Sequence, residues 1–209
     1  MRMEQKANKG AEFDATALIL AGGRGLRMGS EKPLVELGGL PLVDHVKETL
    51  RPHFAELIIV TNRPELYASE DVLVVRDKVP YQGPLAGIYA GLLASSNERN
   101  LVIASDMPFV NLDVIAMLYG KINGSSVAVF ETASGMEPLL GFYSRRCIGP
   151  IGARLEAGER KPVSFYRDVD VALIPESAAR SLDPELTFLF NVNTREDLAK
   201  AQSIVEQPR

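Results

Sequence analysis

Short apolar runs alternate with longer amphipathic stretches along the chain. The runs are bounded by Gly, Pro, Asn or Asp and most are rich in β-branched residues, which is typical of strands. Because the runs are continuously apolar, both faces of each strand are expected to be covered, as in a parallel sheet. This pattern predicts buried strands at residues 17–21, 57–60, 72–75, 101–105 and 127–130.

The amphipathic stretches between these runs predict helices. Two of them open with a proline suited to a first helical turn, and the last is expected to be capped by Thr194. The expected helices are 41–51, 84–95, 111–120, 146–157 and 194–205, with further strands at 137–143 and 169–174. The sequence therefore predicts a three-layer α/β/α sandwich around a mostly parallel, Rossmann-like sheet.

Length and composition narrow the class of protein. A chain of 209 residues suits one domain, expected at 17–209 after a flexible polar leader at 1–16. The net charge of −4 argues against a nucleic-acid partner, and no apolar run approaches the length of a membrane helix. Cys147 is the only cysteine, so no internal disulfide can form, and a cytoplasmic location is expected.

The loop after the first predicted strand is rich in glycine. It has four glycines within residues 22–29, followed by Lys32, with Arg27 between them. Glycine lets the backbone approach a ligand and turn its amides toward an anion, and the two cations suit phosphate. The spacing matches neither the dinucleotide fingerprint nor the P-loop. A glycine-rich turn with surface cations is the plain alternative.

The segment LAGGRGLRMGSEKPL resembles the LAGG-x-x-x-RMG-x-x-K signature of the molybdenum cofactor guanylyltransferases, the MobA family. That family lies within the nucleotidyltransferases of the glycosyltransferase-A-like, nucleotide-diphospho-sugar transferase fold. Further similar segments follow in order at Asp77, at 83–87, at 105–109, at 155–161 and at 191–194. The first loop is shared with cytidylyl and sugar-nucleotide transferases, whereas the ordered set is more specific.

The resemblance implies a set of roles for these residues. It implies Mg²⁺-dependent transfer of GMP from GTP to the phosphate of molybdopterin (Mo-molybdopterin), with release of pyrophosphate. Asp106 would bind Mg²⁺, and Arg27, Lys32 and Asp106 would act in catalysis. The expected nucleotide-binding residues are Leu20, Ala21, Gly22, Gly23, Lys32, Asn62, Asp77 and Asp106, and the expected acceptor-binding residues are Arg27, Gly83, Asn191 and Asn193. Transient contacts with molybdenum-insertion proteins or apo-molybdoenzymes are also expected.

Two details concern the nucleotide. Relatives that transfer CMP usually have LAAG where this chain has LAGG, so Gly22 favours the larger guanine. Some relatives have an asparagine where this chain has Val60, and the chain instead offers Asn62, which alternatively shapes the turn. The alternatives to GMP transfer are a cytidylyl or sugar-phosphate nucleotidyltransferase and a non-catalytic GTP-binding cofactor chaperone.

Other polar residues have simpler interpretations. Asp106 alone would suit a turn before Pro108. A basic region at 144–161 is either a solvated helix face or a site where Arg160 or Lys161 receives the anionic acceptor. His45, His53 and Cys147 are expected to be structural or solvent-facing.

Overall fold

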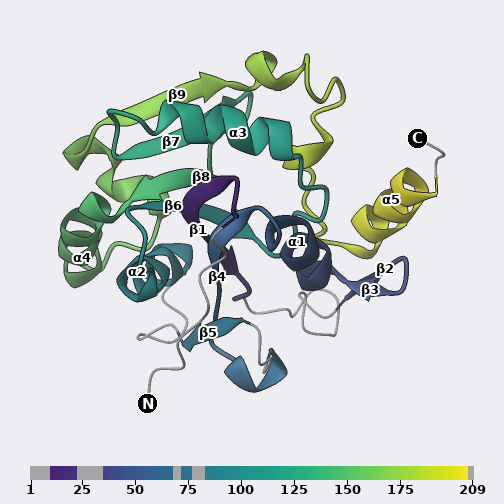
Figure 1. Cartoon of the computed structure of the whole chain (residues 1–209), viewed down its shortest axis with the longest axis horizontal. Helices are drawn as coiled ribbons and strands as arrows, with labels where there is room; N and C mark the ends of the chain where they lie inside the picture. Colours follow the sequence, from purple (N-terminus) through teal and green to yellow (C-terminus); the bar gives the residue numbers. More distant parts are fainter. Residues whose placement is uncertain (1–9, 23–34, 68–71, 77–82, 207–209) are drawn as a thin grey trace.

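The computed structural model describes residues 10–22, 35–67, 72–76 and 83–206. Its centre is a seven-stranded sheet with the order β5-β4-β1-β6-β8-β7-β9 (Figure 1). The strands are β1 (Phe13–Leu20), β4 (Phe54–Thr61), β5 (Leu73–Arg76), β6 (Arg99–Ala104), β7 (Val127–Thr132), β8 (Gly135–Ser144) and β9 (Val171–Pro175). Only β8 runs against its neighbours, so the prediction of a mostly parallel sheet is confirmed.

Helices cover both faces of this sheet, as the continuous apolarity of the strands predicts. Along β1, Ile19 packs with α1 (Leu42–Leu50) and α3 (Leu112–Lys121) on one face. The preceding residue, Leu18, packs with α2 (Pro84–Ala94) and α4 (Ile148–Glu156) on the other face. The three-layer α/β/α architecture is therefore confirmed.

A smaller apolar cluster lies beside the main layers. Helix α5 (Arg195–Val205) and the hairpin of β2 (Glu36–Leu37) and β3 (Leu40–Pro41) project together from one side of the sheet (Figure 1). Their buried contacts are few: Leu37, Leu42, Val192 and Ala201 form the centre of this cluster. Thr194 caps α5 in a capping box with Asp197, as expected for an N-cap threonine.

Some boundaries differ from the sequence prediction. Strand β1 starts at Phe13, so the last four residues of the expected leader, 13–16, belong to the sheet. The predicted helix at 146–157 begins instead as a 3-10 turn, η3 (Arg145–Cys147), and continues as α4. No described helix has the length and apolarity needed to cross a membrane.

The order of the strands marks a place for a ligand. From β1, the chain adds β4 and β5 on one side and then returns to add β6 on the other. Open α/β sheets bind ligands outside the carboxyl ends of their strands, at such a reversal. Leu20, the last residue of β1, is in register with Val60 of β4 and Ala104 of β6. The segments after these three strands therefore meet at one place, the carboxyl end of the sheet.

Candidate active site

The segment after β1 is held by hydrogen bonds to β4. The Ala21 amide donates to the Val60 carbonyl at 2.9 Å, and the Thr61 hydroxyl donates to the Ala21 carbonyl at 2.9 Å. Ala21 is buried, whereas Gly22 is exposed, and a Cβ added to Gly22 would meet no atom of the described residues within 4 Å. Within the described part of the chain, the backbone at Gly22 is therefore accessible, as a nucleotide contact requires. The expected residues Gly23, Arg27 and Lys32 lie outside the described residues.

Asn62 follows β4 and faces the same end of the sheet. Its Oδ1 atom is buried and has no hydrogen-bond partner in the part of the chain that the structure describes. The turn itself is stabilised by Thr61, whose hydroxyl accepts from the Arg63 amide at 3.1 Å. A buried acceptor without a partner costs free energy, so a donor from a ligand is a natural explanation for Asn62.

Asp106 follows β6 and lies between the end of β1 and the segment before α5. The adjacent Ser105 amide donates to the Leu20 carbonyl at 3.1 Å. The Val192 amide donates to the Asp106 carbonyl at 2.9 Å, which brings Asn191 and Asn193 to the same place. Both asparagines are half-buried, and Asp106 is half-buried as well. The structure thus brings together predicted residues separated by more than 80 positions in the sequence.

Glu137 is a member of the site that the sequence did not indicate. Antiparallel pairing matches Ile103 of β6 with Leu140 of β8, so Asp106 lies three residues beyond this pair and Glu137 three residues before it. Burial raises the pKa of Glu137, a hydrogen bond from the Leu139 amide lowers it, and the nearby charge of Asp106 raises it. The net result is a raised pKa, caused mainly by burial, and the smaller effect of Asp106 agrees with the strand register that places the two carboxyl groups at the same end of the sheet.

Gly83 lies where the expected acceptor would bind, at the start of α2. Its φ of 84° is a left-handed conformation that glycine adopts without strain, and Pro84 then begins the helix. A Cβ at Gly83 would lie 3.3 Å from the carbonyl oxygen of Arg160. The glycine therefore allows the turn containing Arg160 to pack against the N-terminus of α2. Asp77 lies outside the described residues.

The basic region at 144–161 separates into two groups. Arg145 donates to the Leu92 carbonyl at 3.1 Å near the end of α2, and Arg146 lies 3.8 Å from Glu98 in an exposed ion pair. Arg154 pairs with Asp168 and Glu159. Arg145, Arg146 and Arg154 thus have structural roles. Arg160 and Lys161, the two residues of the acceptor hypothesis, are both exposed.

Comparison with known proteins identifies the family. The family model described as "MobA-like NTP transferase domain" matches residues 17–173. The chain belongs to the MobA-like NTP transferase family. This assignment makes it a nucleotidyltransferase and confirms the family expected from the glycine-rich loop and the ordered motifs.

Relatives match across almost the whole chain. A "Probable molybdenum cofactor guanylyltransferase" from Pelotomaculum thermopropionicum is 39% identical over 198 residues, which are 94% of this chain and 96% of that protein. A "Molybdenum cofactor guanylyltransferase" from Desulfosudis oleivorans is 35% identical over 93% of this chain and 97% of that protein. The crystal structure of "Molybdopterin-guanine dinucleotide biosynthesis protein A" from Archaeoglobus fulgidus superposes with a TM-score of 0.81 at 29% identity, covering 91% of this chain and 98% of that one.

The donor atoms in this MobA-like domain fit a divalent cation. Asp106 and Glu137 offer carboxylate oxygens at the carboxyl end of the sheet, and Mg²⁺ prefers one or two carboxylates together with phosphate oxygens and water. Among the described residues, no group of three or more His, Cys, Asp or Glu side chains gathers to bind a metal. The residues therefore fit a cation that is shared with a phosphate ligand better than one enclosed by protein.

The histidines and the cysteine do not belong to this site. His45 contacts the Leu37 carbonyl at 2.8 Å, and His53 contacts the Glu12 carboxylate at 2.9 Å. Cys147 is buried, and burial raises its pKa to about 12, although the Ser144 backbone lowers it and the charge of Glu98 raises it further. A thiol with this pKa is a poor nucleophile at neutral pH, so the structural interpretation of these residues is confirmed.

Proposed function

We propose that the protein transfers GMP from GTP to the terminal phosphate of molybdopterin. A phosphate oxygen of molybdopterin attacks the α-phosphorus of GTP, the bond to the β-phosphate breaks, and pyrophosphate leaves. The product is the guanine dinucleotide form of the molybdenum cofactor. The observation that carries the proposal is the meeting of Ala21–Gly22, Asn62, Asp106 and Asn191–Asn193 at one end of the sheet.

The substrates are proposed from relatives and from the space at Gly22. Relatives of up to 39% identity are named molybdenum cofactor guanylyltransferases. No described atom lies within 4 Å of a Cβ on Gly22, which supports guanine, since the alanine usual in CMP-transferring relatives would project into this space. In this proposal Asn62 binds the nucleotide through its buried Oδ1, while Asn191, Asn193 and Gly83 lie on the acceptor side.

The proposed chemistry needs charge neutralisation more than a base. A phosphomonoester carries about −1.5 to −2 charge at pH 7, so the attacking oxygen is already ionised. The attack therefore needs no histidine as a base, and His45 and His53 instead contact the Leu37 carbonyl and the Glu12 carboxylate. We propose that Arg27, Lys32 and the cation-binding Asp106 offset the negative charge of the two substrates, with Gly23 and Asp77 contributing to nucleotide binding.

Asp106 and Glu137 would hold the proposed Mg²⁺. When bound, the ion supplies positive charge to the α-phosphate and orients its oxygens, which is the main requirement of such transfers. The protein's own part is to fix these two carboxylates. The Asp106 backbone is tied to Val192, and a Glu137 oxygen accepts from the Leu139 amide at 3.0 Å.

The test is pyrophosphate release from each of the four nucleoside triphosphates with Mg²⁺ and molybdopterin. We expect turnover with GTP, and Asp106→Ala should lower the rate by about 10²–10³, as expected for loss of one preorganised charged group. Asp113→Ala, a change at an exposed carboxylate on α3, is the matched control and should keep the wild-type rate.

Each other outcome contradicts a stated part of the proposal. Turnover with CTP but not GTP would overturn the guanine assignment. Tight GTP binding without turnover would favour a non-catalytic cofactor chaperone. An active Asp106→Ala variant with unchanged Mg²⁺ dependence would remove Asp106 from the reaction.

A further inference from the structure

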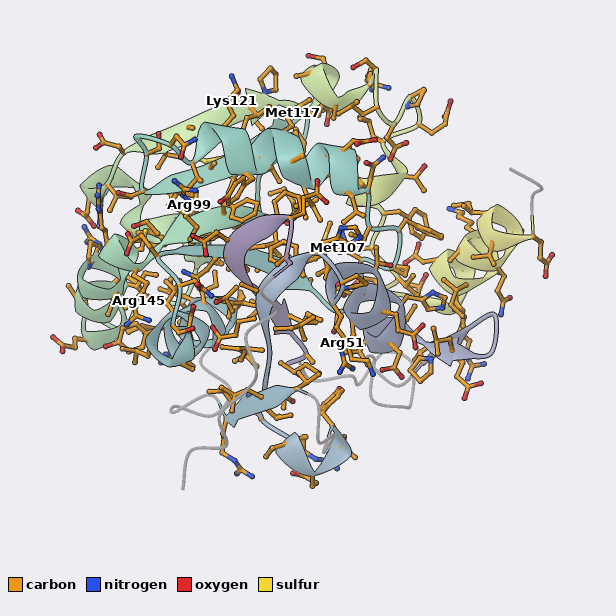
Figure 2. The ribbon with its side chains drawn as sticks, in the orientation of Figure 1. Arg51, Arg99, Met107, Met117, Lys121 and Arg145 are labelled. Atoms are coloured by element: carbon orange, nitrogen blue, oxygen red, sulfur yellow. The ribbon has the colours of Figure 1, made fainter. Side chains whose placement is uncertain are left out.

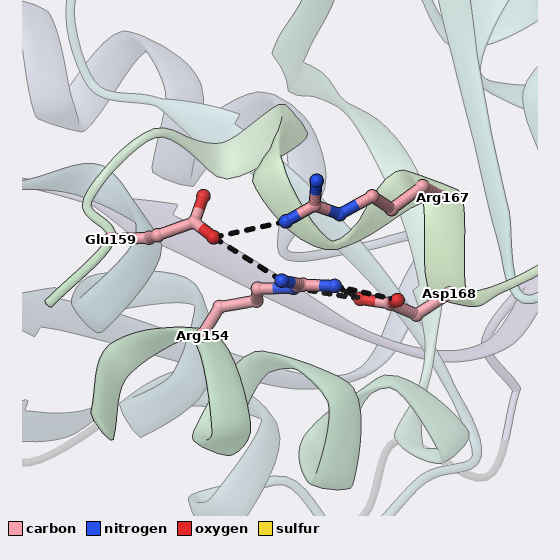
Figure 3. A network of polar contacts seen from close by, with 4 residues as sticks. All are labelled: Arg154, Glu159, Arg167 and Asp168. Atoms are coloured by element: carbon pink, nitrogen blue, oxygen red, sulfur yellow. Dashed lines mark hydrogen bonds and ion pairs between the residues drawn. The ribbon is translucent and has the colours of Figure 1, made fainter. Parts of the chain in front are cut away.

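Arg154 is the centre of an ion-pair network on the side of α4 (Figure 3). Its guanidinium binds Asp168 in a bidentate manner, through Nε to Oδ2 at 2.8 Å and through Nη2 to Oδ1 at 2.6 Å. Its remaining nitrogen, Nη1, donates to Glu159 Oε1 at 3.3 Å. Arg167 donates to the same Glu159 oxygen at 3.2 Å. Bidentate pairs of this kind fix direction as well as distance.

The network holds both ends of the segment 159–168. Glu159 stands at its beginning, directly before Arg160 and Lys161, and Asp168 is the last residue of η4 (Pro162–Asp168). Arg154 itself lies in α4, whose neighbours include α2 and η4. A single guanidinium on a helix thus ties down the turn at its start and the 3-10 helix at its end.

Backbone hydrogen bonds complete the attachment at the start of the segment. The Gly158 amide donates to the Leu155 carbonyl at 3.0 Å, and the Glu159 amide donates to the Arg154 carbonyl at 2.9 Å. Gly158 has a φ of 81°, so the chain can turn sharply after α4 and return toward α2. The side chain and the carbonyl of Arg154 therefore hold the same turn.

This turn reaches the candidate acceptor side. The Arg160 carbonyl oxygen and Cβ lie 3.3 and 3.6 Å from the position of a Cβ on Gly83. The network contains two arginines and two carboxylates, so its charges cancel. Arg160 and Lys161 give the turn its net positive charge. The turn packs against the N-terminus of the 11-residue helix α2, and a helix N-terminus also favours anions.

We propose that Arg154 is a positioning residue for the anionic acceptor: by binding Glu159 and Asp168, it holds the Arg160–Lys161 turn against Gly83 so that the turn can receive the acceptor's phosphate. This inference rests on the proposed function. Arg154 acts through the turn and does not touch the substrate. Its side chain is only 21% exposed, in agreement with a supporting role beneath the surface that binds.

Two measurements on the full chain test separately whether Arg154 holds the turn and whether the held turn binds the acceptor. The first is hydrogen exchange at the amides of residues 158–161, which requires no substrate. The second is steady-state pyrophosphate release, which gives the KM for GTP and the KM for molybdopterin separately. The variants are Arg154→Leu, Arg154→Lys and Asp168→Asn. Arg146→Leu is the matched control, since it removes an arginine of the same basic region whose partner is Glu98.

We expect Arg154→Leu to speed exchange at residues 158–161 and to raise the KM for molybdopterin by about 10- to 100-fold, because small misplacements of binding groups have effects of this size. The KM for GTP should stay at the wild-type value. Arg154→Lys should recover part of the loss, since it keeps the charge without the bidentate geometry. Arg146→Leu should change neither KM.

Failure of the inference can be told from failure of the proposed function. An active wild type whose molybdopterin KM is unchanged in Arg154→Leu and Asp168→Asn would overturn the inference alone, even with faster exchange in the turn. Equal increases in both KM values would overturn it as well, because they would indicate general loosening. If Arg154→Leu does not fold, Arg154→Lys and Asp168→Asn decide the matter. A wild type without turnover would overturn the proposed function and the inference together.

Discussion

The two ends of the central sheet use polar side chains in different ways. At the amino end, the buried Thr16 donates to Glu56 at 2.6 Å, contacts Ser95 at 2.6 Å and accepts from Asn97 at 3.0 Å. Glu56 also accepts from the amide and the hydroxyl of Ser96. At the carboxyl end, the buried oxygen of Asn62 has no partner among the described residues, and burial together with the charge of Asp106 raises the pKa of Glu137.

The comparison distinguishes polar groups that stabilise the fold from polar groups that form the candidate site. At the amino end Thr16, Glu56, Ser95 and Asn97 bind one another, so this network stabilises the fold, and Asn100 Oδ1 is the buried oxygen there without a partner among the described residues. At the carboxyl end, the backbone holds Asp106 and Glu137 in place, and the Asn62 oxygen is buried without a partner among the described residues. A buried acceptor without a partner costs free energy, so this end of the sheet suits donors and cations from a ligand. Figure 2 shows the side chains of the described residues on the ribbon.

After the loss of rate expected for Asp106→Ala, the next largest effect at the carboxyl end follows from Gly22→Ala. A Cβ there would meet no described atom within 4 Å, so the thermal midpoint should not change. If guanine occupies this space, one added methyl should lower kcat/KM for GTP by about 10- to 200-fold, or ~1–3 kcal/mol. Measurement with GTP and CTP in parallel tests this. A fall in stability without a change in GTP turnover would contradict our assignment of the space.

A matched pair of substitutions compares the two ends directly. Thr16→Val should cost about 1–3 kcal/mol of stability, because Ser95 and Asn97 each lose a buried partner, while the KM for GTP remains unchanged. Asn62→Leu should have the opposite pattern, with unchanged or slightly higher stability and a GTP affinity weakened by about 1 kcal/mol. Denaturant unfolding and GTP titration measure the two quantities. Equal stability losses in both variants would mean that the ends do not differ in this way.

The smallest effect concerns pH. Burial and the charge of Asp106 raise the pKa of Glu137 above its unfolded value of 4.5, against the hydrogen bond from Leu139. A carboxyl group with a raised folded pKa stabilises the fold below the unfolded pKa, and this contribution is lost as the pH rises through the folded pKa. Glu137→Gln should therefore raise the thermal midpoint relative to wild type at pH 8 more than at pH 4, without metal. A difference independent of pH would contradict this account.

The fold was largely predictable because its strands are buried on both faces. Continuous apolar runs such as 57–60 and 101–105 predict strands covered on both faces. In the structure these runs contribute residues 57–60 to β4 and residues 101–104 to β6. The hairpin of β2 and β3 was missed since strands of two residues have no measurable period. The sequence predicts a leader that includes Phe13 and Thr16, because polar residues stand before and between them and interrupt the apolar run.

The site was predictable where its residues follow strands. Ala21, Asn62 and Asp106 each come directly after a buried run, and parallel strands bring such positions together. Glu137 lies within β8, and nothing in residues 137–143 shows that this strand runs in reverse and brings its beginning to the site. The partners of Arg154 are not predictable from the sequence for another reason. Asp168 lies 14 positions away, beyond the spacing at which charges on one helix contact each other.

The reversed direction of β8 has a consequence for conformational entropy. Loops after parallel strands must lose backbone freedom when a ligand orders them, at a cost of about 1–2 kcal/mol per residue. Glu137 instead reaches the same place from inside a strand, paired with Phe130 of β7, so its backbone has already lost that freedom when the chain folds. One reversed strand in a parallel sheet thus delivers a carboxylate whose ordering is complete before any substrate arrives.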